Sequence, residues 1–253
     1  MGKLAKLMEL ASTNVGFLVL CGGIIALLIG FAYGAEVILA KKHNTVRKQE
    51  QLKLKRMVII ALLSAISVVL MYFEFPLWFA PGFYKLDFSE IPVIVGAFTL
   101  GPVAGLSIEF IKIFLKILIK GTETVFVGEF ANFLIGSAFV IPASFFYAMK
   151  KNRKNAIIGL SLGSIVATVA GAFLNAFILL PKYAEVFGPR MNMNYDQAMN
   201  SFIAAGTEKN PAIQNMVTFV LFAVTPFNLI KYGAVSIITI LIYKKISHIL
   251  KAH

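Results

Sequence analysis

Long apolar runs alternate with short polar or cationic connections along almost the whole chain. Seven runs have the composition of membrane-embedded helices, and they cover residues 15–40, 57–73, 88–100, 103–120, 129–149, 156–180 and 226–243. A helix needs roughly 20 apolar residues to cross the hydrocarbon core of a bilayer, so most runs are long enough and the run at 88–100 is short. The pattern predicts an all-α integral membrane protein.

The basic residues gather in every second connection. Blocks at 41–56, 150–154 and 244–251 hold 14 of the 24 lysines and arginines. Cytoplasmic connections carry an excess of lysine and arginine, so the blocks predict seven crossings, with the N-terminus outside and the C-terminus in the cytoplasm. This arrangement also argues against nucleic-acid binding, although the formal net charge is +12.

Composition supports the membrane class. Hydrophobic residues make up 58% of the chain, whereas soluble domains average roughly 45–50%. The single cysteine, Cys21, can form no internal disulfide. The run at 15–40 exceeds the roughly 7–15 apolar residues of a cleaved signal peptide, so we interpret it as an anchor helix. Glu36, near its end, is interpreted as a structural residue.

Polar residues interrupt the last apolar run near its start. Thr225 and Pro226 have the pattern of an N-cap and a first helical residue. Asn228 and Lys231 then stand three positions apart and project from one helix face. Ionisable groups at membrane depth usually face a cavity or a partner, although a lysine can also snorkel to the interface. Because Asn175 is predicted to lie at a similar depth, we expect a ligand pocket in the outer half.

Two outer connections surround the expected pocket. The segment 74–87 is rich in aromatic residues, proline and glycine, which favours either a shaped loop or an interfacial belt. At its end, Asp87 and Glu90 have the spacing of an N-cap and a capping box. The segment 181–224 is long for a connection, and we expect an interfacial or re-entrant helix at 213–222 within it. The two interpretations of the whole segment are a functional lid and a structural decoration.

A few more charged and polar residues lie within the runs. Glu109 and Lys112 stand three positions apart, with Lys116 on the same face, and they are expected either to pair or to snorkel. Glu129 and Asn132 share a helix face near the outer end of their run.

The sequence lacks the motifs of several membrane enzymes. It has no G-x-x-x-x-G-K-[ST] phosphate loop, no H-E-x-x-H zinc motif and no G-x-S-x-G elbow. Amide groups and an ammonium beneath an aromatic loop suit a neutral, hydrogen-bond-rich solute with a flat ring. No cofactor or metal is expected. A membrane enzyme that uses Lys231 as a base or Schiff-base former remains an alternative.

Four motifs in order resemble the substrate-binding S-components of energy-coupling-factor (ECF) vitamin transporters, specifically those for riboflavin. The resemblance covers about residues 56–243. The motifs are Lys85-Leu86-Asp87-Phe88-Ser89-Glu90-Ile91-Pro92, Gly101-Pro102-x-x-Gly105, Gly128-Glu129-x-Ala131-Asn132-Phe133 and Pro226-Phe227-Asn228-x-x-Lys231.

The resemblance implies a six-helix substrate-binding membrane domain at 57–253, preceded by an extra transmembrane helix at 1–40 and a basic cytoplasmic linker at 41–56. Such a bundle binds riboflavin at its extracellular face and is not an enzyme. It docks on a membrane scaffold subunit that carries two cytoplasmic ATPases, here through Ala61 and Ala65. The implied substrate contacts are Asn175, Asn228, Lys231, Lys85, Leu86, Asp87, Glu129 and Asn132. FMN or another vitamin remains an alternative substrate.

Overall fold

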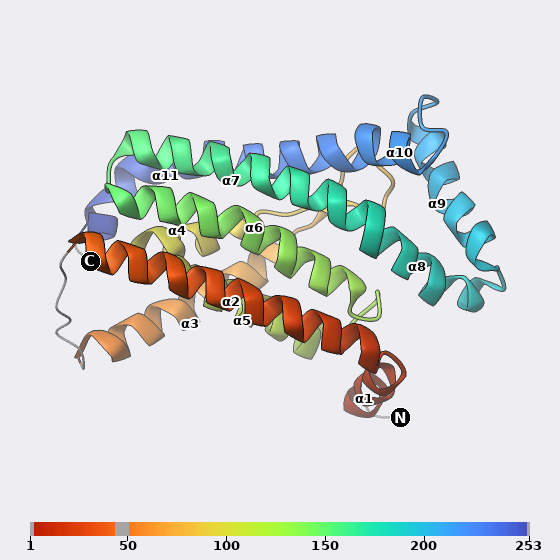
Figure 1. Cartoon of the computed structure of the whole chain (residues 1–253), viewed down its shortest axis with the longest axis horizontal. Helices are drawn as coiled ribbons and strands as arrows, with labels where there is room; N and C mark the ends of the chain where they lie inside the picture. The colour runs from red at the N-terminus through yellow and green to blue at the C-terminus, as the bar shows by residue number, and fades with distance from the viewer. Residues whose placement is uncertain (1–2, 44–50, 252–253) are drawn as a thin grey trace.

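The computed structural model describes residues 3–43 and 51–251 and shows an elongated helical bundle (Figure 1). The first half contains helices α1 to α6 and a two-stranded hairpin of β1 and β2. Their bounds are α1 Lys3–Thr13, α2 Val15–His43, α3 Gln51–Met71, β1 Phe75–Pro76, β2 Lys85–Leu86, α4 Glu90–Leu100, α5 Pro102–Lys120 and α6 Val127–Met149. The hairpin strands are antiparallel, with Phe75 opposite Leu86.

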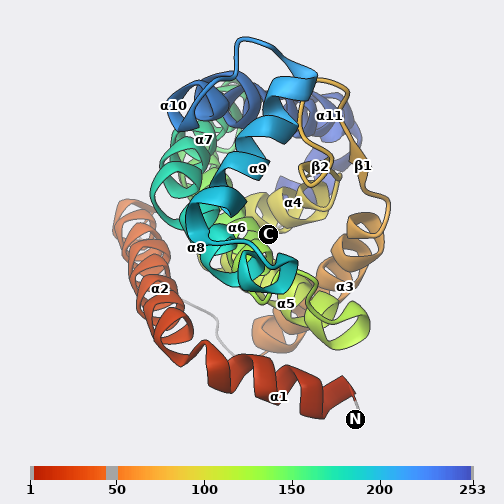
Figure 2. The same ribbon diagram turned by 90° about the vertical axis from the view of Figure 1, so that its right-hand side faces the viewer.

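The second half is almost continuously helical. Its elements are α7 Arg153–Leu174, π-helix η1 Asn175–Leu179, α8 Leu180–Phe187, 3₁₀-helix η2 Pro189–Met191, α9 Tyr195–Lys209, α10 Met216–Phe219, π-helix η3 Val220–Val224 and α11 Thr225–Lys251. The most extensive packing joins α6 to α7, followed by α7 to α11. Figure 2 shows α2 on the outside of the bundle, with α1 turned across its end.

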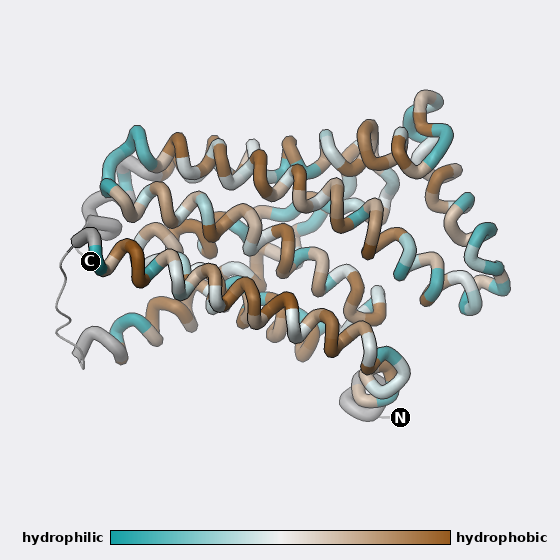
Figure 3. Tube along the Cα trace, viewed as in Figure 1, coloured by the Kyte–Doolittle hydropathy of each residue, from teal (hydrophilic) through white to brown (hydrophobic). Residues whose placement is uncertain are grey.

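Helices occupy all seven predicted positions. Within the part of the chain that the structure describes, five helices are long and apolar enough to cross a membrane, namely Val15–Lys41, Leu54–Met71, Val127–Met149, Arg153–Met191 and Met216–Ile242. Apolar residues run along these helices and polar residues gather towards their ends (Figure 3). Helix α4 is apolar but short, and α5 carries several charged residues. The predicted all-α membrane fold is therefore confirmed, whereas the number of crossings stays a prediction.

The connection between the first two long helices is shorter than predicted. Helix α2 continues to His43 and α3 begins at Gln51, so helix enters the predicted linker 41–56 from both sides. The rest of that linker, at 44–50, lies outside the described residues. Glu36 is structural, as predicted, because its Oε1 pairs with Arg56 at 3.1 Å and accepts the Val103 N–H at 3.2 Å. These contacts fasten α2 to α3 and to the start of α5.

The segment 181–224 is not an open loop. The helix that starts at Arg153 continues through η1 into α8, so Asn175 lies inside a long helix and not near its outer end. The expected separate helix at 213–222 is instead the beginning of the last long helix, formed by α10 and η3. Asn215 caps it with a capping box to Thr218.

Thr225 is therefore not an N-cap. Its backbone is α-helical, and its hydroxyl donates to the Val220 carbonyl at 2.9 Å. Pro226 is the second residue of α11, two positions after the end of η3, where a turn of irregular helix tolerates a residue without an N–H. Lys231 consequently projects from the interior of a long helix.

Candidate functional site

A cavity of about 430 Å³ opens between α6, the α7–α8 helix, α11 and the loop around β1 and β2. Its size is within the range of roughly 300–1,000 Å³ that is usual for small-molecule sites. Seven of the eight predicted contacts line it, namely Asn175, Asn228, Lys231, Lys85, Asp87, Glu129 and Asn132. Leu86 does not; it is buried against Ala80 and Phe227 beneath the loop.

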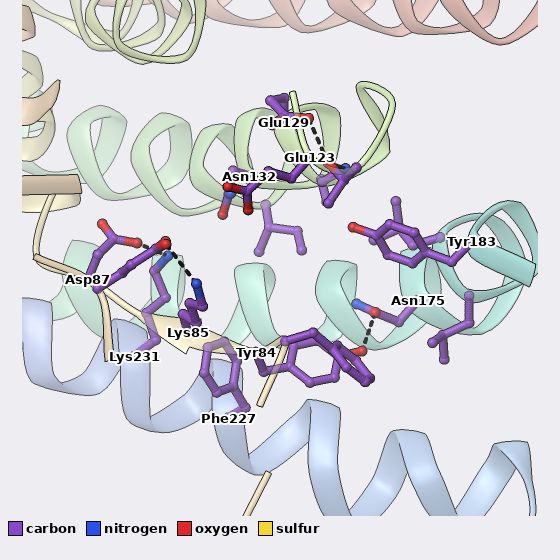
Figure 4. A pocket seen from close by; sticks show the side chains of 18 of the residues that line it. Tyr84, Lys85, Asp87, Glu123, Glu129, Asn132, Asn175, Tyr183, Phe227 and Lys231 are labelled. Carbon is purple, nitrogen blue, oxygen red and sulfur yellow. Dashed lines mark hydrogen bonds and ion pairs between the residues drawn. The ribbon is translucent and has the colours of Figure 1, made fainter. Parts of the chain in front are cut away.

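A buried ion pair forms one end of the cavity. The Lys231 Nζ lies 2.9 Å from Asp87 Oδ2, and both side chains are only 5% exposed (Figure 4). Asp87 Oδ1 also accepts the Ser89 N–H at 2.8 Å. Burial alone would raise the pKa of Asp87, but Lys231 and, further off, Lys112 lower the pKa to about 2. The pair therefore joins the loop to α11 while both groups are charged.

The predicted capping box at Asp87 and Glu90 is wrong. The N-cap of α4 is Ser89, whose side chain makes no capping hydrogen bond, and of the backbone N–H groups at this helix end Asp87 accepts only that of Ser89 itself. The Glu90 side chain instead points into the bundle and accepts a hydrogen bond from Lys112 at 2.8 Å. Glu90 thus forms an ion pair with a distant residue instead of the helix cap that the local pattern predicted.

Two asparagines present amide groups at the cavity from neighbouring helices. Asn175 Nδ2 donates to the Gly171 carbonyl at 2.8 Å, and its Oδ1 accepts the Tyr84 hydroxyl at 2.6 Å. Asn228 Nδ2 donates to the Val224 carbonyl at 2.9 Å. A Cβ added to Gly171 would lie 2.7 Å from Asn228 Nδ2, so this glycine provides space for the Asn228 amide.

The opposite wall belongs to α6. Glu129 Oε2 accepts the hydroxyls of Thr122 and Thr124 at 2.9 and 2.7 Å, and its Oε1 lies 3.5 Å from Lys116. These contacts hold the turn before α6. Asn132, one turn further along, lines the cavity and points towards it in Figure 4. Glu129 is therefore occupied by protein groups, whereas Asn132 faces the cavity.

Charged groups from the loop and α5 meet at the cavity mouth. Lys85 Nζ pairs with Glu74 Oε1 at 2.9 Å, and Lys120 approaches the same oxygen at 3.4 Å. The pKa of Glu74 is lowered because these cations outweigh the effect of its burial. Lys85 is 40% exposed, so its contact with solvent distinguishes it from the buried Lys231.

Aromatic side chains form a wall that sequence reasoning largely missed. Tyr84 lies 5.3 Å from the Phe227 ring and 4.8 Å from the Phe83 ring, measured between centroids. Burial raises the pKa of Tyr84 well above its usual value, so it is a neutral donor to Asn175. Tyr183 and Phe202 also line the cavity. The aromatic content of the loop pointed to Tyr84, but Tyr183 and Phe202 were hidden in a segment that was predicted to be a connection.

The described residues hold no group of three or more His, Cys, Asp or Glu that could bind a metal ion. The predicted docking residues, Ala61 and Ala65, are both exposed on α3. They share a face with exposed apolar side chains such as Leu62 and Val69. What covers this face is treated below as a proposal.

The model of the family "ECF transporter, substrate-specific component" matches residues 55–243. The chain belongs to this family. A curated relative, the riboflavin transporter RibU of Staphylococcus aureus (strain TCH60), is 35% identical over 208 residues, which cover 82% of this chain and 98% of that protein. The riboflavin transporter FmnP of Bacillus subtilis (strain 168) is 31% identical and covers 77% of this chain and 93% of that protein.

A solved structure gives the same result. It is described as the S component of a bacterial ECF transporter and aligns with a TM-score of 0.59 at 33% identity, covering 79% of this chain and 99% of that one. This substrate-specific component is thus a multi-pass membrane protein. The predictions of a transport subunit and not an enzyme are confirmed by its family.

Proposed function

We propose that this substrate-specific component captures riboflavin in the cavity between α6, α7 and α11. The observation that carries the proposal is the convergence of Asn228, Asn175 and the Lys231–Asp87 pair on one cavity beneath an aromatic wall. Both curated relatives described above are named as riboflavin transporters. A flat, polar ring with a hydroxylated side chain has the chemistry that such a cavity accommodates.

The cavity groups divide into two kinds. Tyr84 and Phe227 supply aromatic surface for the ring. The amides of Asn175, Asn228 and Asn132 supply donors and acceptors for ring edges and hydroxyls, and the Lys231 ammonium has donors beyond the one that Asp87 accepts. Lys85, Leu86, Asp87 and Glu129 act mainly by shaping the loop and the mouth.

The cavity opens to the outside in this proposal. The turn between α6 and α7, which carries Lys150, Lys151, Arg153 and Lys154, lies at one end of the bundle, whereas α8 and α9 lie at the other (Figure 1). Cationic connections favour the cytoplasm. The N-terminus is then outside and the C-terminus inside.

Release into the cell requires partners. The chain contains no phosphate loop of its own, so we assign energy coupling to a separate membrane scaffold with two cytoplasmic ATPases. The exposed α3 face around Ala61 and Ala65 is the proposed docking surface, because small residues allow close helix approach in a membrane. The division into an N-terminal helix at 1–40, a linker at 41–56 and a substrate domain at 57–253 belongs to the same proposal.

The test is titration of the purified, detergent-solubilised protein with riboflavin, followed by quenching of flavin fluorescence. We expect saturable one-to-one binding at nanomolar to micromolar concentration. Asn228→Ala and Lys231→Ala should each weaken binding by about tenfold or more, which is about 1.4 kcal/mol. Lys209→Ala is the control, since Lys209 is exposed on α9 and does not line the cavity.

Parallel titrations with FMN and thiamine distinguish the remaining substrates. Binding of FMN alone would change the substrate and keep the site. Failure of every flavin to bind a folded protein would refute the riboflavin assignment. Unchanged affinity in both Asn228→Ala and Lys231→Ala would refute the site.

A further inference from the structure

A second cluster of charged residues lies deeper in the bundle than the Lys231–Asp87 pair. It consists of Glu90 on α4 with Glu109 and Lys112 on α5, and we call it the Glu90–Glu109–Lys112 cluster. Their side chains are 2%, 0% and 1% exposed. None of the three lines the cavity, so the binding site described above does not explain why they are buried. Ionisable groups inside a membrane bundle usually have a function.

One ammonium serves two carboxyl groups in this cluster. Lys112 Nζ donates to Glu90 Oε1 at 2.8 Å and lies 2.7 Å from Glu109 Oε2. The second contact is an ion-pair distance without the alignment of a hydrogen bond, since both Glu109 oxygens lack a hydrogen-bond partner. Glu90 Oε2 lacks one as well. Among the described residues, Lys112 is thus the one cation that both carboxyl groups contact.

The two carboxyl groups converge at a glycine on α6. A Cβ added to Gly136 would lie 2.6 Å from Glu109 Oε1 and 3.1 Å from Glu90 Oε1. Any larger residue at this position would collide with the acids. Gly136 therefore provides the space that lets Glu90, Glu109 and Lys112 meet where α4, α5 and α6 pack together.

Among the described residues, the groups next to the cluster supply no second cation. On the α11 side, Lys231 is paired with Asp87, and Tyr232 is a neutral phenol. Further along α5, Lys116 faces Glu129. With both acids ionised, the cluster would carry one uncompensated negative charge inside the bundle, which is strongly unfavourable. Two carboxyl groups that share one site do not both ionise.

We propose that the Glu90–Glu109–Lys112 cluster is a proton-binding site that holds one proton at neutral pH, carried by Glu109. Lys112 makes its aligned hydrogen bond to Glu90, which marks Glu90 as the ionised partner. The proton on Glu109 makes the cluster neutral, because the charges of Glu90 and Lys112 then cancel. Glu90 then stays fixed to α5, and Asp87, three residues before it, is held opposite Lys231.

Infrared spectroscopy of the full chain, in a detergent that has no ester or carboxyl groups, tests this proposal without reference to any substrate. At pH 7 the wild type should show the C=O band of a buried protonated carboxyl group, which shifts to lower frequency in D₂O. Glu109→Gln should abolish the band, because glutamine replaces the protonated acid. Glu129→Gln is the matched control and should retain it, since Glu129 is buried but bonded to two hydroxyls and close to Lys116.

Absence of the band from the folded wild type would refute the proton site, and its persistence in Glu109→Gln would refute the assignment to Glu109. Lys112→Met supplies a second measurement. Removal of the cluster's cation should leave both Glu90 and Glu109 protonated, which should roughly double the intensity of the band. An unchanged band in folded Lys112→Met would also contradict the proposal. Should Lys112→Met fail to fold, the comparison of wild type with Glu109→Gln still shows whether Glu109 carries the proton.

Discussion

The two halves of the bundle use the same helices in different ways. Towards the α6–α7 turn, Gly159 and Gly163 of α7 press against the backbone carbonyls of Ala143 and Phe139 on α6. Towards α8 and α9, α7 and α11 become π-helical in η1 and η3, and these two turns contact each other beside the cavity. We call the end near the α6–α7 turn the closed half, because small residues pack its helices tightly. We call the end near α8 and α9 the open half, because irregular helix separates its helices.

The difference teaches how a cavity arises in a membrane bundle. Small residues let helices approach until their backbones touch, which leaves no space. A π turn inserts extra backbone and redirects the side chains after it, and such turns often occur at functional sites. Asn175 begins η1, and Asn228 follows η3 by one turn. The irregular turns thus both open the bundle and aim its amides.

The sharpest way to break the closed half is Gly159→Leu. The new side chain would collide with the Ala143 carbonyl, which is backbone and cannot move aside. Overpacking typically costs 1–3 kcal/mol and more at a rigid contact, so we expect about 3 kcal/mol or more. The thermal unfolding midpoint of the detergent-solubilised protein should fall further than in any other variant discussed here. Gly233→Ala is the control, because no atom lies within 4 Å of a Cβ at that glycine.

Removing one partner of the buried ion pair should have the next largest effect. Asp87→Asn leaves the Lys231 ammonium buried without a counter-charge. Loss of one partner of a buried pair costs roughly 3–5 kcal/mol, and we expect the lower end, about 3 kcal/mol, because Lys231 lines the cavity. The double variant Asp87→Asn/Lys231→Met should recover much of the thermal stability but not riboflavin binding. A double variant as unstable as Asp87→Asn alone would show that the unpaired charge of Lys231 is not the cause of the lost thermal stability.

The sequence alone was sufficient to identify those cavity residues that are polar within an otherwise apolar helix. Asn175, Asn228 and Lys231 were identifiable because amides and cations are rare inside membrane helices. Glu90 was misassigned, because its spacing from Asp87 matches a local cap while its partner, Lys112, is distant in the sequence. The Thr225-Pro226 pair similarly matches a helix start, but the capping box at Asn215 lies upstream and η3 absorbs the proline.

Other features depend on packing that no local pattern encodes. Tyr183 and Phe202 reach the cavity only because α8 and α9 fold back over it. Gly171 has no signal that separates it from the other glycines of α7. Its role follows from the place of Asn228 on a neighbouring helix.

Gly171→Ala should therefore weaken binding with little loss of stability. The added methyl group would lie 2.7 Å from Asn228 Nδ2, so the amide has to shift within the open half of the bundle. We expect riboflavin affinity to fall by about tenfold, or 1.4 kcal/mol. The thermal midpoint should stay close to that of Gly233→Ala. A large loss of stability with unchanged affinity would mean that this region is packed as tightly as the closed half.

The last expected effect is absent at neutral pH and concerns the Lys231–Asp87 pair in acid. The pKa of Asp87 is about 2 in the folded protein and about 3.9 in an unfolded chain. A carboxyl group with a lowered pKa stabilises the fold fully above its unfolded pKa, and this contribution disappears as the pH falls through its folded pKa. The thermal midpoint of the wild type, measured relative to that of Asp87→Asn/Lys231→Met, should stay constant from pH 8 to pH 5. The difference should then change between pH 4 and pH 2 in the direction that disfavours the wild type. A change already between pH 7 and pH 5 would show that burial raises the pKa of Asp87 more than Lys231 lowers it. No change down to pH 2 would show that the pair stabilises the fold no more than the exposed Lys85–Glu74 pair at the mouth.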